Sequence, residues 1–202
     1  MSRAPKKISL AVILLILIIW SVAFLFFAEH EPSIPLSNAP LLFDASRAYR
    51  LMSEFVTQNP SRVLGSLESR QSTGYLRDYL QELGYEIEYS HFEARIARKK
   101  QVGRNVLAFK KGKSEEILAV IAHFDSARTT VQGAMKNGAA VGVLLELARI
   151  FALSPTQKSL LLVFSDGGEW GSLGAQEIAD RYPARPRIVA VLSLDYVASG
   201  DL

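Results

Sequence analysis

Histidine and acidic side chains that could bind a metal ion directly follow three apolar runs of the sequence. His123 and Asp125 come after ILAVIA, Asp166 and Glu169 come after LLLVFS, and Asp195 comes after IVAVLSL. Ligands of open α/β sheets bind at the carboxyl ends of the strands, where such residues would gather. A His-x-Asp pair is typical of a metal-binding histidine whose second ring nitrogen is held by the carboxylate. Three such strand ends favour a metal site, although an exposed histidine and aspartate remain the alternative for the pair alone.

The motifs around these residues resemble those of the M28 zinc peptidases, a family of aminopeptidase-like enzymes that are often membrane-anchored. The resemblance covers roughly residues 41–202, and its most specific segments are AHFDS, GAMKNGAAVGVLLELAR, FSDGGEWGSLGAQ and LSLDYV. It implies a zinc-exopeptidase-like fold, two zinc ions and hydrolysis of N-terminal peptide bonds. It also implies that His123 and Asp195 hold one zinc ion, that Glu169 helps to hold the other, and that Asp125 orients His123.

The sequence departs from the family pattern at positions that carry the chemistry. The bridging carboxylate of the family is replaced by Lys136 and the general-base glutamate by Gly168, and the last histidine ligand lies further along the family pattern than Leu202. A catalytic zinc ion usually has three protein ligands and a water molecule. We therefore expect zinc occupancy to be poor and activity to be impaired. Asp166 is a weaker candidate for a substitute base.

Lys136 could take over the electrostatic role of a metal ion. Without a cation, the carboxylates of Asp125, Glu169 and Asp195 would repel one another at the strand ends. An ammonium group among them would offset that repulsion. We therefore hypothesise that Lys136 Nζ lies within salt-bridge distance of at least one of these carboxylates. The alternative is a lysine that points to solvent from the loop before Asn137.

The elements that must position these residues alternate between strands and helices. This order predicts an α/β fold with a mostly parallel, mixed sheet flanked by helices. One helix should begin at Asp44 and a second at Ser66 or Ser69, with Gly84 ending the second. We expect the other elements at the following positions: a half-buried strand over 85–89, a strand over 105–110, a helix over 137–153, a helix over 174–181, and apolar strands over 117–122, 160–164 and 188–194, the first and last of them buried.

A membrane segment precedes the globular part of the chain. Residues 8–28 form an uncharged, mostly apolar run, and about 20 such residues suffice for a transmembrane helix. Arg3, Lys6 and Lys7 precede the run, whereas acidic residues follow it. The positive-inside rule then places the N-terminus in the cytoplasm and the peptidase-like domain outside it. We interpret the run as a signal-anchor.

These patterns divide the chain into segments, and the last of them carries the candidate site. We predict a cytoplasmic tip over 1–7, a transmembrane helix over 8–28, a Pro-rich tether over 29–40 and an M28 peptidase-like domain over 41–202. Because the last family ligand has no counterpart before Leu202, we expect that domain to be incomplete at its C-terminus.

The composition excludes several classes of function. The chain has no cysteine, which rules out disulfides, thiolate catalysis and Cys-ligated zinc. Its formal net charge of +3 equals the charge of the N-terminal tip, so the rest of the chain is balanced and no nucleic-acid partner is expected. A cluster of basic residues between Arg95 and Lys113 is interpreted as a solvated edge hairpin, with contact to anionic lipid as the alternative.

Two functions remain open from the sequence. The first is a membrane-anchored M28-type metallopeptidase whose zinc-dependent hydrolysis is impaired. The alternative is a pseudoenzyme, a catalytically inactive pseudopeptidase that binds peptide or a protein partner without cleaving it. Both assign the membrane as a partner through residues 8–28, and the site rather than the fold must decide between them.

Overall fold

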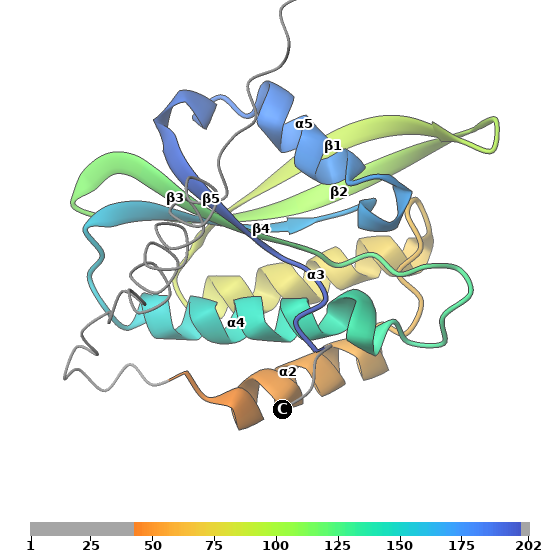
Figure 1. Ribbon diagram of the computed structural model, residues 1–202, viewed down its shortest axis with the longest axis horizontal. Helices are drawn as coiled ribbons and strands as arrows, with labels where there is room; N and C mark the ends of the chain where they lie inside the picture. Colours follow the sequence, from red (N-terminus) through yellow and green to blue (C-terminus); the bar gives the residue numbers. More distant parts are fainter. Residues whose placement is uncertain (1–42, 199–202) are drawn as a thin grey trace, which may run out of the picture. The chain divides into compact units, whose positions relative to one another are not determined.

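A five-stranded mixed sheet forms the centre of the domain (Figure 1). The computed structural model describes residues 43–198, and the predicted transmembrane helix and tether lie outside the described residues. The strands lie in the order β1-β2-β4-β3-β5, and their bounds are β1 Glu86–Ile96, β2 Lys99–Lys110, β3 Ser114–His123, β4 Lys158–Ser165 and β5 Ile188–Leu194. Within residues 43–198, no helix has both the length and the apolar character needed to cross a membrane.

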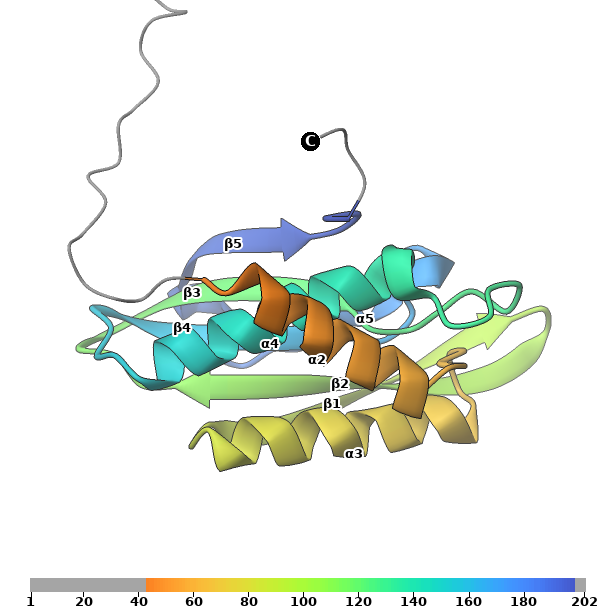
Figure 2. The same ribbon diagram turned by 90° about the horizontal axis from the view of Figure 1, so that it is seen from below.

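Helices cover both faces of the sheet and give the domain three layers. The bounds of the helices are α2 Ala45–Gln58, α3 Leu67–Glu82, α4 Ala139–Ala152 and α5 Leu173–Arg181. Figure 2 shows α2, α3 and α4 together on one side of the sheet, with α5 on the other side. The α/β architecture with flanking helices is therefore as predicted.

The alternation of side chains along the strands explains the two cores. Val106 and Ala108 of β2 pack with the helices α2, α3 and α4, whereas Leu107 between them faces the opposite core, which includes Ile178 of α5. Leu162 of β4 likewise belongs to the first core. Successive strand residues point to opposite faces, so a central strand with both faces covered must be apolar throughout.

Side-chain caps begin two of the helices where the sequence indicated. Asp44 caps α2 by accepting the backbone N–H of Arg47 at 3.0 Å. Ser66, rather than Ser69, caps α3, because its hydroxyl accepts the N–H of Ser69 at 3.0 Å. Gly84 follows α3 with φ of +84°, a conformation that favours glycine after a helix.

The directions of the strands agree with the prediction of a mostly parallel, mixed sheet. The β3–β4 and β3–β5 pairs are parallel, whereas β2 is antiparallel to both of its neighbours, β1 and β4. Among the described strands, β2 alone therefore runs against the others. One predicted feature of the sheet is wrong: the strand β5 is not buried, since Val191 is 63% exposed. It pairs with β3 along one edge, and among the described residues its apolar side chains remain accessible.

Candidate functional site

The candidate site lies where three parallel strands end side by side. His123 is the last residue of β3 and is in register with Ser165, the last residue of β4. Beyond them, Phe124 donates its backbone N–H to the carbonyl of Ser165 at 2.9 Å. On the other side of β3, Ala122 pairs with Leu194, the last residue of β5. The residues that follow these strands are therefore brought to one edge of the sheet, as the sequence predicted.

His123 lies between two carboxylates. Its Nδ1 is 3.1 Å from Oδ1 of Asp125, and its Nε2 is 3.7 Å from Oδ1 of Asp195. The Asp125 side chain is fully buried, whereas the Asp195 side chain is 56% exposed. Asp125 is thus placed to orient the imidazole, and Asp195 presents a carboxylate to solvent beside it.

The Asp125 carboxylate also fixes the turn that follows β4. Its Oδ1 accepts the backbone N–H of Gly168 at 2.7 Å, and its Oδ2 accepts that of Glu169 at 3.1 Å. Hydrogen bonds from two consecutive N–H groups to one buried carboxylate hold this turn against the end of β3. Asp125 therefore positions both His123 and Glu169.

Lys136 reaches the same edge of the sheet. It lies in η1, a short wide turn over Ala134–Gly138 that precedes α4. Its Nζ is 3.5 Å from Oε1 of Glu169 and 5.6 Å from the ring centroid of Tyr196. The hypothesis that Lys136 lies within salt-bridge distance of a site carboxylate is confirmed. The side chains of Lys136 and Glu169 are 39% and 15% exposed, so this ion pair is partly screened by water.

Gly168, the predicted position of the family's general-base glutamate, lies against His123. A Cβ atom built on Gly168 would lie 2.1 Å from Cγ of His123, which is far inside van der Waals contact. Any side chain at this position therefore requires the His123 ring or the turn to move. The position of the imidazole therefore depends on the absence of a side chain at residue 168.

These side chains do not fit the two zinc ions of the family. His123, Glu169 and Asp195 lie at the expected edge, but within residues 43–198 no three histidine or acidic side chains are close enough together to bind one metal ion. The bridging position holds an ammonium group paired with Glu169, and that positive charge would oppose a dication there. We therefore derive no reaction step through zinc.

Asp166 lies beneath the site and is unsuited to replace the missing base. Its Oδ2 accepts the Ser69 hydroxyl and the Arg104 backbone N–H, both at 3.2 Å, and its Oδ1 accepts the N–H of Gly167 at 2.9 Å. Burial, together with the nearby charge of Asp125, raises the pKa of Asp166 to about 7. Both carboxyl oxygens of Asp166 thus already accept hydrogen bonds, from Ser69 of α3, Arg104 of β2 and Gly167.

Arg62 stabilises the loop between Asp125 and Lys136, a role that the sequence did not indicate. Its fully buried guanidinium donates to the carbonyls of Phe124 at 2.6 Å, Gln132 at 2.9 Å and Gly133 at 3.2 Å. Burial lowers the pKa of Arg62 to about 10, and it remains charged at neutral pH. These bonds fix the start and the end of the loop that connects Asp125 with Lys136. An arginine between Pro60 and an apolar Val-Leu pair gave no distinctive signal of burial.

The fold is that of zinc-dependent exopeptidases and glutaminyl cyclases. A Zn-dependent exopeptidase from Parabacteroides distasonis superimposes with a TM-score of 0.67 at 22% identity, covering 77% of this chain and 62% of that chain. A glutaminyl cyclase from Porphyromonas gingivalis superimposes with a TM-score of 0.69 at 27% identity, covering 79% of this chain and 61% of that chain.

The sequence comparisons match the family that the motifs resemble. Residues 105–202 match the sequence pattern of Peptidase family M28, which confirms the resemblance that the motifs indicate. The alkaline phosphatase isozyme conversion protein of Escherichia coli (strain K12) is 28% identical over an alignment of 166 residues, and the match covers 70% of this chain and 48% of that protein. The chain thus spans about half the length of this curated relative.

Proposed function

We propose that this M28 peptidase-like domain binds the free amino terminus of a peptide and that its zinc-dependent hydrolysis is impaired. The observation that carries the proposal is the distance of 3.5 Å between Lys136 Nζ and Glu169 Oε1. It places an ammonium group where the family pattern has the carboxylate that bridges two metal ions. An active zinc exopeptidase is the competing function.

The charges at the site favour a cationic ligand. The carboxylates of Asp125, Glu169 and Asp195 outnumber the ammonium of Lys136. Asp125 is occupied by His123 and by two backbone N–H groups, and Glu169 pairs with Lys136. Asp195 is more than half exposed, which leaves its carboxylate accessible to a peptide ammonium group.

Calorimetric titration of the purified full chain tests amino-terminal recognition. The probes are Ala-Ala-Gln-Ala amide, its N-acetylated form, and the corresponding glutaminyl peptide Gln-Ala-Gln-Ala amide. We expect the free amines to bind and the acetylated peptide to bind at least about tenfold more weakly, because it lacks the charge. Asp195→Asn should remove this difference, whereas Asp180→Asn, an exposed aspartate of α5, should retain it. Equal binding of free and acetylated peptides would contradict the proposal.

Elemental analysis and peptide hydrolysis test the proposed impairment. The wild-type chain, equilibrated with zinc and desalted, should hold less than two zinc ions and release little alanine from the same peptides. Lys136→Asp should gain zinc, since it replaces the ammonium with a carboxylate. Lys113→Asp, at an exposed lysine outside the site, is the matched control. Two zinc ions together with rapid alanine release in the wild type would establish the competing function.

We further propose that the chain is a single-pass membrane protein with its N-terminus in the cytoplasm. The support is the apolar run over residues 8–28 and the basic residues that precede it. A phosphatase reporter fused after Leu202 should be active only when the domain is outside the cytoplasm. A reporter that is active only inside the cytoplasm would overturn the topology.

A further inference from the structure

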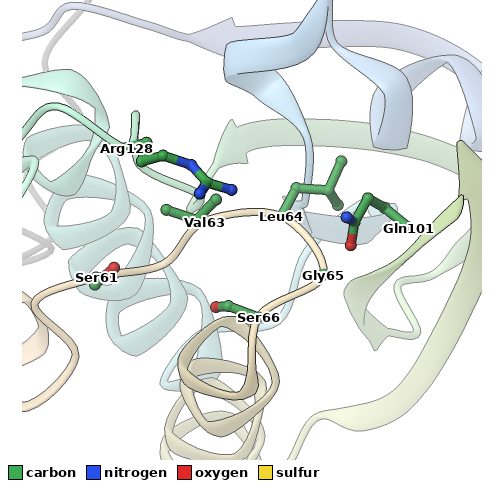
Figure 3. Close-up of a pocket in the computed structure, with 7 residues that line it drawn as sticks. All are labelled: Ser61, Val63, Leu64, Gly65, Ser66, Gln101 and Arg128. Carbon is green, nitrogen blue, oxygen red and sulfur yellow. The ribbon is translucent and has the colours of Figure 1, made fainter. Parts of the chain in front are cut away.

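A cavity of about 380 Å³ lies next to the candidate site (Figure 3). Its walls come from the loop before α3, from the β1–β2 hairpin and from the loop that follows Asp125. The polar lining residues are Ser61, Ser66, Gln101 and Arg128, and the apolar ones include Val63 and Leu64. In Figure 3 the Leu64 side chain lies between Arg128 and Gln101, and the Gln101 amide lies near Gly65.

The lining is rich in donors and carries positive charge. Arg128 is the charged residue of the lining, and no carboxylate is among the residues that line the cavity. The Ser66 oxygen accepts the N–H of Ser69, so its hydroxyl proton is directed elsewhere. A guanidinium with hydroxyl and amide donors suits a carboxylate, because charge-assisted hydrogen bonds are stronger than neutral ones.

Hydrogen bonds hold the walls of the cavity together before any ligand binds. The backbone N–H of Arg62 donates a hydrogen bond to Ser126 Oγ at 2.9 Å. The backbone N–H of Ser126 donates one to the Arg62 carbonyl at 3.2 Å. These bonds join the loop that carries Val63 to the loop that carries Arg128. Such preorganisation reduces the ordering cost of binding.

The Leu64 side chain connects the cavity wall with the turn that carries Glu169. Leu64, which lines the cavity, is only 4% exposed, and its Cδ2 would lie 3.4 Å from a Cβ atom built on Gly167. Gly167 is two residues before Glu169, which pairs with Lys136. One side chain therefore separates the cavity from the turn at the candidate site.

We propose that this cavity binds a carboxylate of the peptide, so that the domain selects peptides with an acidic group near their amino terminus. The proposal rests on the proposed function, since it assumes that peptide is the ligand. The carboxylate could belong to an acidic side chain or to the C-terminus of a short peptide. Arg128 supplies the charge that recognises it in either case.

Calorimetric titrations of the full chain with matched peptides test this selectivity. The probes are Ala-Ala-Gln-Ala amide, three variants with glutamate at position 2, 3 or 4, the same neutral peptide with a free C-terminal carboxylate, and glutarate alone. We expect at least one acidic peptide to bind about tenfold more tightly than the neutral amide, the gain expected from one charge-assisted hydrogen bond. The position of the best carboxylate distinguishes a side chain from a C-terminus.

Two arginine variants locate the selectivity. Arg128→Gln keeps a polar side chain but removes the charge, and it should reduce the ratio of acidic to neutral peptide affinity from about ten to about one. Arg50→Gln, at an exposed arginine of α2, should retain the preference. Equal binding of acidic and neutral peptides by the wild type would overturn the proposal, as would a preference that survives in Arg128→Gln.

Glutarate separates failure of this proposal from failure of the proposed function. Arg128-dependent binding of glutarate with no binding of any peptide would support a carboxylate site and contradict peptide recognition. Binding of the neutral peptide without any effect of acidic groups would support peptide recognition and contradict the carboxylate site. If neither glutarate nor any peptide binds, both proposals are wrong.

Discussion

The Asp125 carboxylate holds Gly168 by a hydrogen bond of 2.7 Å from the Gly168 N–H to Oδ1. The same oxygen lies 3.1 Å from Nδ1 of His123. One buried carboxylate therefore fixes the imidazole and the turn after β4 in mutual contact. This contact leaves no room for a Cβ atom at position 168. A single substitution that restores the family glutamate at this position would therefore disturb His123.

Gly168→Ala should destabilise the domain by about 1–3 kcal/mol, because the added methyl group overpacks against His123. Gly74→Ala provides the control, since a Cβ atom at Gly74 in α3 meets no atom within 4 Å. Alanine is favoured over glycine inside helices, so this variant should be more stable by about 0.5–1 kcal/mol. Urea unfolding of both variants measures the two effects. Equal stability of Gly168→Ala and wild type would show that the turn relaxes freely.

Lys136→Met should lower the free energy of unfolding by no more than about 1 kcal/mol. The ion pair with Glu169 is partly exposed, and solvent screening keeps such pairs weak. Lys136→Asp should cost more, because it places a carboxylate beside Glu169, and added zinc should recover part of the loss. Lys113→Met, at an exposed lysine, should leave thermal unfolding unchanged. A Lys136→Asp variant as stable as Lys136→Met without zinc would contradict the assigned contact.

Arg62→Met should destabilise the domain by about 3–5 kcal/mol. It removes the guanidinium donors from the carbonyls of Phe124, Gln132 and Gly133, of which Gly133 keeps the backbone N–H of Gly138. Arg62→Lys should recover only part of this stability, because an ammonium group cannot reproduce the planar arrangement of guanidinium donors. Chemical denaturation gives the two values. Hydrogen exchange should show the loss of protection concentrated between Ser126 and Gly133.

Asp166 should make stability fall as the pH rises. Its pKa is about 7 in the folded state and about 3.9 in the unfolded chain. Between these values the folded state binds the additional proton, so unfolding becomes easier by about 1.4 kcal/mol per pH unit at most. Below about pH 4 and above about pH 7 the contribution of Asp166 is constant.

The variant Asp166→Asn isolates this contribution. It should be less sensitive to pH than wild type across the interval, and its stability relative to wild type should increase toward pH 7. Urea unfolding at several pH values gives the difference. A constant difference between the two proteins from pH 4 to pH 8 would show that Asp166 ionises normally. Other acids cancel in this comparison because both proteins contain them.

Local signals in the sequence were sufficient to predict most of the fold. Asp44 and Ser66 are capping residues whose chemistry depends only on the first helical turn. The strand over Ile188–Leu194 was predicted with its exact bounds because it is an unbroken apolar run. The same apolar run suggested burial, which is wrong for β5, since burial depends on which other elements cover a strand. The antiparallel β2–β4 pairing also depends on long-range contacts that periodicity does not encode.

Part of the site followed from the sequence because parallel strands bring their ends together. That geometry placed His123 beside Asp125 and Asp195. The charge argument placed Lys136 beside at least one of three carboxylates, and the structure identifies it as that of Glu169. The roles of these residues stay predictions. Arg62 and the cavity around Arg128 could not be predicted, because both arise where loops distant in sequence meet.

The hydrogen bonds of Arg62 fix both ends of the loop between Phe124 and Gly133, whereas the middle of this loop is free of them. The Arg62 guanidinium holds the loop at Phe124 and again at Gln132 and Gly133. Residues 128–131 between these points are exposed, and Val131 is 88% accessible. Changes in length or sequence in the middle of such a loop cost little stability. Relatives could therefore diversify the residues around position 128, and with them ligand preference, without disturbing His123 or Asp125.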